Sequence, residues 1–328
     1  TSRRHYRYRS RHAVTQNLIA RDVHCDASLP TQVVMSRIHA TLSSPYFLGA
    51  AAIFFASCMN AMIKGLSVYE SVIVITAWRY ALGALLVSTL WLLFRPPLPG
   101  WRSVPFHLFR GFFQICAASL FFWSVTQIPL ATAAALGLTG TLMIGPLAWL
   151  LMREPLKRDV IIGTVAGFAG AMFIVNNETQ LFSGTTEGPV LGYLAPILAS
   201  LCHSISVVLL RFRSQSEDPI VVAFFANTLP ALYVIPVFFL VDSQPTTALF
   251  SGYVVSAFFG VSFWSLTTLA YARAPAARLA PITYSQLIWA AVIGFFIFGE
   301  FPGASTWSGA AIIVAACLYV MRSGNKTA

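Results

Sequence analysis

Charged residues are scarce in this 328-residue chain: they make up 10% of the sequence, whereas a soluble domain carries roughly 25%. Hydrophobic residues make up 57%, and the mean hydropathy is +0.72. These values exclude an ordinary water-soluble domain. The regular alternation of polar and apolar residues that marks the strands of a membrane β-barrel is also missing. The composition therefore predicts an all-α membrane protein with several membrane-spanning helices.

Residue patterns that carry catalysis or bind metals are missing as well. The five cysteines have no paired or metal-type spacing, so we expect no disulfide, no metal site and no cofactor. An H-E-x-x-H motif is absent, and the serine–glycine pairs fall in predicted loops or at the start of apolar segments. An intramembrane protease would need two aspartates inside its spans, whereas Asp159, Asp218 and Asp242 lie at the ends of apolar segments. We therefore predict that the protein is not an enzyme.

Ten apolar segments are each long enough to form a helix across a hydrocarbon core of ~30 Å. Charged residues or Pro and Gly separate them. The predicted spans are residues 45–64, 71–94, 104–127, 129–152, 158–176, 189–211, 219–241, 247–271, 276–299 and 303–322. The fold prediction is therefore a bundle of ten transmembrane helices.

Residues 1–44 differ from the rest of the chain in being rich in arginine and poor in apolar and acidic residues. Such a composition resembles that of an organelle transit peptide. Since no amphipathic helix is evident, a disordered tail, or sequence upstream of a start at Met35, accounts for it more simply. The tail also inflates the formal net charge of +10, which therefore gives no reason to expect a nucleic-acid partner.

Basic residues gather on one side of the predicted membrane. If the N-terminus is cytoplasmic, its side holds the arginines of the tail together with Arg95, Arg102, Arg153, Lys157, Arg158, Arg211, Arg213, Arg273, Arg322 and Lys326. The opposite side holds Lys64 beside the acidic residues Glu70, Glu178, Glu187, Asp242 and Glu300. Because cytoplasmic loops carry an excess of Lys and Arg, both termini are predicted to be cytoplasmic.

Two stretches of the chain match, MREPLKRDVIIG and FGEFPGASTWSG. Glu154 and Glu300 are 146 positions apart, and so are Gly163 and Gly309. Further matches at this offset are Pro129 with Pro275, Thr139 with Ser285, and residues 78–80 with 224–226. Chance similarity between apolar helices does not explain a shared Pro-to-Glu spacing of 25 and a shared Glu-to-Gly spacing of nine. The pattern predicts two copies of one unit.

These copies define the predicted domain organisation: a first repeat at 45–176, an outer linker at 177–188, a second repeat at 189–322 and a short cytoplasmic tail at 323–328. Each repeat holds five predicted helices, and an odd number of spans turns the second copy upside down. Inverted repeats are typical of secondary transporters, which bind their solute near the middle of the membrane between the two halves.

The segments IPLATAAALGLTGTLMIGPLAWLLMREPL and LAPITYSQLIWAAVIGFFIFGEFPGASTWSGAAIIV resemble the two repeats of EamA-type proteins in the drug/metabolite transporter superfamily. The resemblance covers residues 45–322. It departs from the family at Gly140 and Gln286, where many members have proline fourteen residues before the Glu. The wording APITYSQLIWA is similar to a bacterial subgroup that includes carriers proposed for S-adenosylmethionine and riboflavin. The resemblance implies a metabolite transporter of the bacterial inner membrane.

Polar side chains at mid-depth in the spans are the candidate solute ligands, because each would be costly against lipid. The resemblance implies a cavity between the first, third, fourth, sixth, eighth and ninth helices. The candidates on these helices are Asn60, Gln114, Thr139, His203, Tyr284 and Gln286, with the aromatic residues Trp264 and Trp289. Tyr284 and Gln286 are two positions apart, so both can face one cavity only if their helix is distorted, and Pro281 supplies a cause. Asn227 is expected to pack between helices.

Arg79 and His203 are the ionisable residues placed deep in predicted spans. Arg79 either attracts an anionic group of the solute or hydrogen-bonds exposed carbonyls of a broken helix. His203 either packs between helices or contacts the solute, with Ser200 and Ser206 three positions away on either side. No Asp or Glu occupies the middle of a predicted span. Proton coupling through a buried carboxylate therefore has no candidate, which leaves a facilitator, an exchanger or coupling through His203.

Two further sets of residues have predicted structural functions. Gly163, Gly167 and Gly170 form a small-residue stripe that packs helices within the chain or forms a homodimer. Glu154 and Glu300, with Gly163 and Gly309, are the matching motif of the repeats. We expect each Glu to accept N–H groups at the N-terminus of the helix that follows it.

The predicted function is secondary transport of a small organic metabolite by alternating access, with the lipid bilayer as the other partner and no nucleic acid. A channel-like facilitator is the alternative, although neither rings of charge nor a carbonyl filter is visible. An intramembrane enzyme is the remaining alternative.

Overall fold

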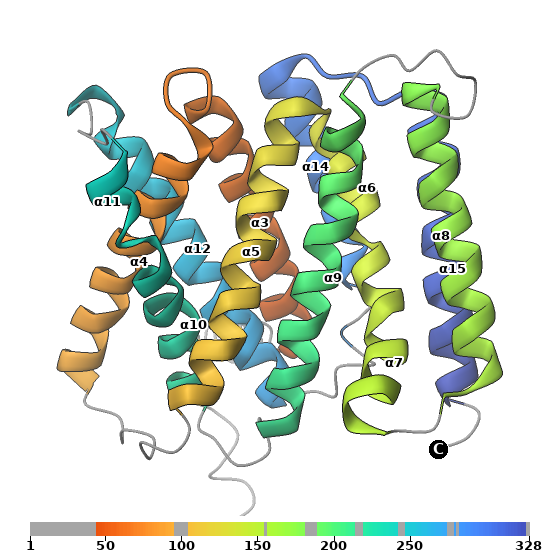
Figure 1. Ribbon diagram of the computed structural model, residues 1–328, viewed down its shortest axis with the longest axis horizontal. Coiled ribbons are helices and arrows are strands. Elements are labelled where there is room, and N and C mark those ends of the chain that lie inside the picture. Colours follow the sequence, from red (N-terminus) through yellow and green to blue (C-terminus); the bar gives the residue numbers. More distant parts are fainter. Residues whose placement is uncertain are drawn as a thin grey trace, which may run out of the picture. The chain divides into compact units, whose positions relative to one another are not determined.

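Apolar runs that end at proline, glycine or charge form the helices of this protein, as a computed structural model of the chain shows (Figure 1). The structure describes residues 44–94, 104–153, 156–180, 189–213, 219–241, 247–273, 279 and 282–325, and in these ranges every regular element is a helix. In chain order they are α3 (Pro45–Leu66), α4 (Val72–Phe94), α5 (Val104–Gln127), α6 (Leu130–Gly137), α7 (Thr139–Met152), α8 (Arg158–Thr179), α9 (Val190–Arg213), α10 (Pro219–Val234), α11 (Val237–Leu240), α12 (Thr247–Arg273), α14 (Ser285–Phe298) and α15 (Ala304–Asn325).

Eight segments of the described chain are long and apolar enough to cross a membrane, with α6 and α7 counted together. The other two predicted spans, 219–241 and 276–299, hold shorter apolar helices, Phe224–Leu240 and Ser285–Phe298. The prediction of a multi-pass helical membrane protein is therefore confirmed. The predicted tail up to residue 43, Glu154 and residues 181–188 of the predicted linker lie outside the described residues.

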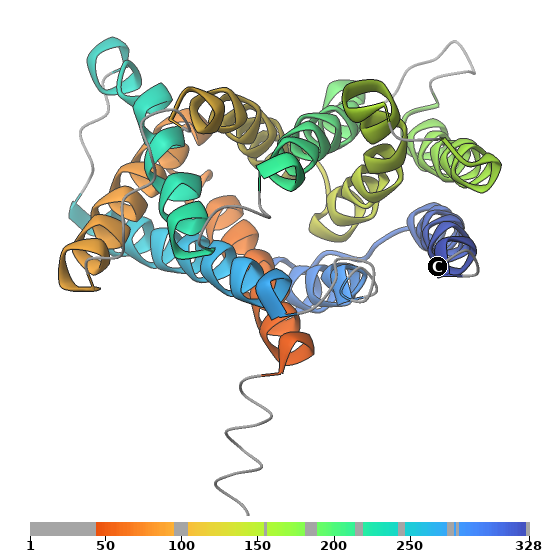
Figure 2. The ribbon, with the colours of Figure 1, turned by 90° about the horizontal axis from the view of Figure 1, so that it is seen from below.

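The helices repeat at the offset that the sequence motifs define. Shifted by 146 positions, α7 and α8 take the bounds of α14 and α15. Helices distant in sequence also pack in a matching pattern: α3 on α12, α5 on α9, α4 on α10 and α8 on α15. The same shift carries α3 onto α9 and α5 onto α12, so the α3–α12 contact in one copy corresponds to the α9–α5 contact in the other. The α4–α10 and α8–α15 contacts each join two equivalent helices. Figure 2 shows α8 and α15 side by side at one edge of the bundle.

Prolines interrupt the hydrogen bonding of α7, α9 and α10, and side chains of neighbouring helices compensate for each one. A proline has no N–H, so the carbonyl four residues earlier loses its donor, and lipid offers no water in its place. The three substitute donors are Thr164 to Leu142 O (3.1 Å) for Pro146, Ser124 to Gly192 O (3.0 Å) for Pro196, and Gln114 Nε2 to Ala226 O (2.6 Å) for Pro230. The Thr164 hydroxyl is shared, since Val160 O of its own helix lies 2.7 Å away. These bonds tie α7 to α8, α9 to α5, and α10 to α5.

Two helices are interrupted at equivalent positions, Leu138 and Tyr284, which are 146 residues apart. Both residues keep right-handed helical angles, with φ of −65° and −68°, and both carbonyls accept a tighter bond from the residue three positions on. At each break a hydroxyl bonds the carbonyl three residues earlier: Thr139 to Leu136 O at 2.7 Å, and Ser285 to Ile282 O at 2.6 Å. The distortion expected before Gln286 is present. The helix also breaks at Leu138, where the residue three positions earlier is not a proline. A proline such as Pro281 is therefore not required for this break.

The glycine stripe of α8 packs within the chain. A Cβ at Gly163 would lie 2.2 Å from Val320 Cγ2 of α15, and one at Gly167 would lie 2.0 Å from Leu142 Cδ1 of α7. The matching glycine of α15, Gly309, has Gly170 O only 2.8 Å from its ideal Cβ position. Glycine at these positions therefore allows α8 and α15 to approach closely.

Candidate functional site

His203 and Trp264 face one another between α9 and α12. Their ring centroids are 6.3 Å apart with planes tilted by 45°, and the His203 side chain is exposed although it lies in the middle of its helix. The bond from Ser124 to Gly192 O fixes the antiparallel register of α5 and α9. Counting ten residues along each helix from that bond puts Gln114 level with Cys202, one residue before His203. The exposed imidazole of His203 therefore lies near the middle of α9, beside the Trp264 ring.

Two serines of α9 near His203, Ser200 and Ser204, bond a neighbouring helix. Ser200 Oγ donates to Gly137 O at 2.8 Å, and Ser204 Oγ donates to Gly140 O at 2.7 Å. These carbonyls lie on either side of the break between α6 and α7, so α9 bonds the interrupted helix on both sides of the break. Gly140 permits the contact, because a Cβ there would lie 3.2 Å from Ser204 Oγ.

Arg79 lies between α3, α4, α5 and α12, and its side chain is only 3% exposed. Its Nη1 donates to Met59 Sδ at 3.7 Å, and the guanidinium carbon lies 3.6 Å from the Tyr80 ring centroid and 5.1 Å from that of Phe122. A Cβ on Gly260 of α12 would lie 2.5 Å from Nη1. The guanidinium is therefore enclosed by two rings, a thioether and a stretch of bare backbone.

Enclosing this charge is costly. An arginine at mid-helix in a membrane costs about 2.5–3.5 kcal/mol on insertion scales, whereas a cation–π contact stabilises by about 0.5–2 kcal/mol. The rings therefore offset part of the cost, but they accept none of the hydrogen bonds that five N–H donors can make. Arg79 Nε has no hydrogen-bond partner among the described residues.

Several candidates from the sequence are occupied by contacts within the chain. Gln114 donates to Ala226 O, the carbonyl freed by Pro230, and Thr139 bonds its own helix at the Leu138 break. Tyr284 Oη lies 3.4 Å from Met321 Sδ and so points toward α15. In this conformation these three residues support the interrupted helices.

The remaining candidates, Asn60, Gln286 and Trp289, differ in how far they are buried. Asn60 is buried next to Met59 of the Arg79 cluster, and Gln286 is half-buried at the start of α14. Trp289 packs edge-on against Phe54 of α3, with ring centroids 5.0 Å apart. The structure thus brings His203 together with Trp264 and places Trp289 at the α3–α14 contact, while Asn60 is buried within α3.

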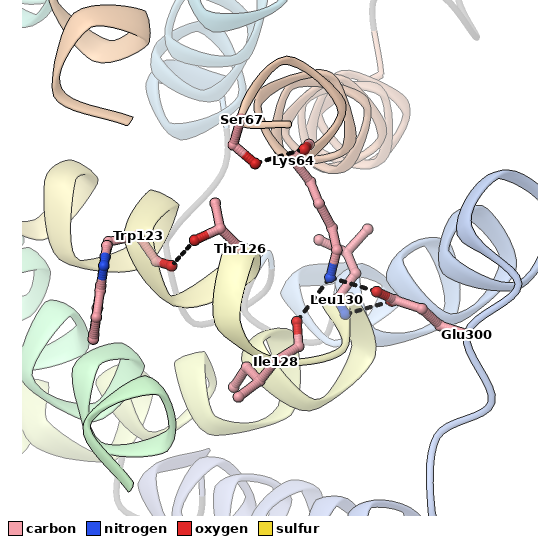
Figure 3. Close-up of polar contacts among 7 residues, drawn as sticks. All are labelled: Lys64, Ser67, Trp123, Thr126, Ile128, Leu130 and Glu300. Carbon is pink, nitrogen blue, oxygen red and sulfur yellow. Dashed lines mark hydrogen bonds and ion pairs between the residues drawn. The ribbon is translucent and has the colours of Figure 1, made fainter. Parts of the chain in front are cut away.

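A second cluster lies where α3, α6 and α14 end or begin (Figure 3). Lys64 Nζ forms a salt bridge with the Glu300 carboxylate and donates to Ile128 O at 2.8 Å, while Leu130 N donates to Glu300 Oε2 at 2.7 Å. Glu300 therefore sits at the N-terminus of α6 and not, as expected, at that of α15. We call these four residues the Lys64–Glu300 clasp. It joins the segment 45–176 to the segment 189–322.

Sequence reasoning missed the clasp and the supporting serines. Lys64 was visible as the lone basic residue among acidic ones on its side of the predicted membrane, but its partner lies 236 positions away. Ser124 and Ser204 gave no signal, since a serine in an apolar helix has many uses, and Ser200 was noted only as a neighbour of His203. The prolines at 146, 196 and 230 were a usable signal, because each leaves the carbonyl four residues earlier without its backbone donor.

The described residues form helices as their regular elements and include eight candidate spans, which places the protein in the class of multi-pass membrane proteins. The model of the EamA-like transporter family matches residues 43–176 and again residues 190–322. The chain therefore belongs to this transporter family, as the resemblance in its repeats predicted.

Three relatives illustrate the range of named solutes. The chain is 25% identical over 263 residues to a riboflavin transporter of Brucella anthropi, covering 78% of this chain and 89% of that one. It is 26% identical to an S-adenosylmethionine uptake transporter of Rickettsia prowazekii (69% and 74% covered) and 26% identical to a pseudopaline exporter of Pseudomonas aeruginosa (86% and 97% covered). A solved crystal structure shares the fold with a TM-score of 0.57 at 18% identity, over 86% of this chain and 98% of that one.

Proposed function

We propose that this protein is a secondary transporter that moves a small organic metabolite by alternating access between two inverted repeats, 45–176 and 189–322. The observation that carries the proposal is the double match to one transporter family model, at an offset at which α7 and α8 coincide with α14 and α15. The exchange of helix pairs under the same offset supports it, because two inverted copies related by a pseudo-two-fold axis pack in this way.

The solute binds near mid-membrane, beside the interrupted helices. Its direct ligands in this proposal are His203, Trp264, Asn60, Gln286 and Trp289, with Arg79 as the charged member. Exposure of His203 next to the Trp264 ring supports this choice. Gln114, Thr139 and Tyr284 hold the helices that line the site, and reach the solute only if a rearrangement frees them.

The Lys64–Glu300 clasp closes the outer end of the site. Basic residues of the described chain support this orientation: Arg153, Lys157, Arg158, Arg273 and Arg322 lie at the helix ends opposite the clasp. Both termini are then cytoplasmic and the membrane is the bacterial inner membrane. A homodimer through Gly163, Gly167 and Gly170 would have to displace α15, and this mechanism needs no second copy.

Counterflow in proteoliposomes tests the proposal. Purified protein is reconstituted with unlabelled riboflavin or S-adenosylmethionine inside, and uptake of the labelled solute is followed. A carrier predicts saturable uptake that the internal solute accelerates. Replacing His203 or Trp264 with Ala should lower the rate about tenfold, whereas Trp307→Phe, at an exposed position, should not. Flux that rises linearly with concentration, without counterflow, would identify a channel-like facilitator instead.

A further inference from the structure

Arg79 is a buried charge that transport of a neutral metabolite would leave unexplained. We propose that Arg79 is an anion-binding group, and that the solute is a small organic anion with a carboxylate or phosphate one helical turn from a planar apolar part. The proposal rests on the function proposed above, since it names the chemical class of the solute for that site.

The partners of Arg79 carry the first step. In the described part of the chain its guanidinium makes one hydrogen bond, to the sulfur of Met59, and Nε has none. A residue that held a broken helix together would donate to carbonyl oxygens, as Ser200 and Ser204 do. Arg79 thus presents N–H donors without an oxygen to receive them, which fits a site whose acceptor arrives with the solute.

No carboxylate of the described chain is placed to neutralise Arg79. Glu70, Asp159, Glu178 and Glu300 all lie at the ends of helices, and the salt bridge among the described residues joins Glu300 to Lys64. A guanidinium does not lose its proton in proteins, so Arg79 cannot become neutral by titration as a buried lysine does. Among the described residues, its charge is therefore matched only when an anion binds.

The guanidinium is closely packed, so an anion has to displace one of its present contacts. Gly260 has no side chain, and a Cβ there would lie 2.5 Å from Nη1 and 3.2 Å from Met59 Sδ. Methionine is flexible and polarisable, so Met59 is the group that moves aside when an oxyanion replaces its sulfur. The planar, forked guanidinium of Arg79 suits a carboxylate or phosphate, which can accept two parallel N–H bonds from it.

The position of the indole ring gives the second part of the solute class. Trp264 follows Gly260 by four residues, so the two lie on the same face of α12, about 6 Å apart along the axis. The Trp264 ring also lies 6.3 Å, centroid to centroid, from the exposed imidazole of His203. An anionic group on Arg79 thus places a planar group one turn away against Trp264 and His203.

Benzoate and benzamide are the probes for this inference, since both are planar and differ in charge. Unfolding of the purified full chain is followed by thermal shift with each compound. Wild-type protein should bind benzoate at least tenfold more tightly than benzamide. Arg79→Met should lose that preference, and Arg153→Gln, which removes an exposed arginine at a helix end, should keep it. Gly260→Ala, which retains the charge but crowds Nη1, should weaken benzoate binding severalfold.

Thermal unfolding without ligand distinguishes an anion-binding Arg79 from a structural one. Removal of an unmatched buried charge should leave the unfolding midpoint of Arg79→Met unchanged or raise it. A midpoint lower by more than about 3 °C, or failure of Arg79→Met to fold, would identify a structural residue and overturn the inference. Equal binding of benzoate and benzamide by wild type would overturn it as well. Counterflow that is independent of Arg79 contradicts the anion site alone, whereas benzoate selectivity without counterflow contradicts transport alone.

Discussion

At the scale of single residues, a proline inside a membrane helix leaves a carbonyl without its donor, and the polar residues of this protein are distributed accordingly. Gln114 is an example. Its position at mid-depth predicted a solute ligand, but its amide donates at 2.6 Å to Ala226 O, the carbonyl that Pro230 leaves free. The presence of Gln114 therefore follows from the sequence of another helix.

Replacing Gln114 with Leu should destabilise the protein, because Ala226 O then has no donor. An unsatisfied buried acceptor costs about 1–3 kcal/mol. The change Pro230→Ala restores a backbone N–H at the right place, so the double variant should recover most of the loss in thermal stability. Unfolding midpoints of the two single variants and the double variant measure the coupling. Additive effects of the two changes would show that Gln114 does not serve the Pro230 break.

At the scale of helices, the repeat offset was readable from the sequence because packing constrains it. Glycines and a Pro-to-Glu spacing recur where α7 and α8 correspond to α14 and α15. The breaks at Leu138 and Tyr284 were only half readable. Pro281 indicated a distortion in one copy, whereas the other copy breaks without a proline at the matching position.

Contacts between distant helices could not be predicted in this way. Periodicity tells which face of a helix is apolar, but not which helix covers it. For this reason the sequence left open whether the stripe of Gly163 packs inside the chain, and it gave Lys64 no partner. The structure assigns the first to α15 and the second to Glu300.

The α8–α15 contact should be sensitive to a single methyl group. At Gly163, Ala would place its Cβ 2.2 Å from Val320 Cγ2 and 3.2 Å from Ala316 O. The helices would have to move apart, which should lower the free energy of unfolding by about 1–3 kcal/mol, the usual cost of overpacking a protein core. The matched control is Gly65→Ala near the end of α3, where nothing lies within 4 Å, and which should be neutral or slightly stabilising. Equal midpoints for the two variants would contradict the packing described here.

At the scale of the whole molecule, the two repeats have opposite orientations in the proposed mechanism, and charge sets which end faces the cytoplasm. Reporter domains fused after Lys157 and after Arg213 should report a cytoplasmic location. Fusions after Gly184 and Asp242 should report the outside. A cytoplasmic reporter after Gly184 would contradict the inverted arrangement, because the second repeat would then enter the membrane from the same side as the first.

The Lys64–Glu300 clasp links the repeats at one end of the bundle, so alternating access requires that it open in each transport cycle. Its bonds to Ile128 O and Leu130 N tie the junction of α5 and α6 to the end of α14. A mechanism in which the repeats stay fixed, as in an open channel, places no such demand on the clasp.

Covalent closure of the clasp is the most direct test of alternating access. In a background without the native cysteines, Lys64→Cys and Glu300→Cys are joined with a short, reducible bifunctional thiol reagent, and counterflow is measured in proteoliposomes. We predict that crosslinking abolishes counterflow, that reduction restores it, and that each single-cysteine variant treated with the same reagent keeps its rate. Counterflow that continues unchanged in the crosslinked protein would contradict the mechanism.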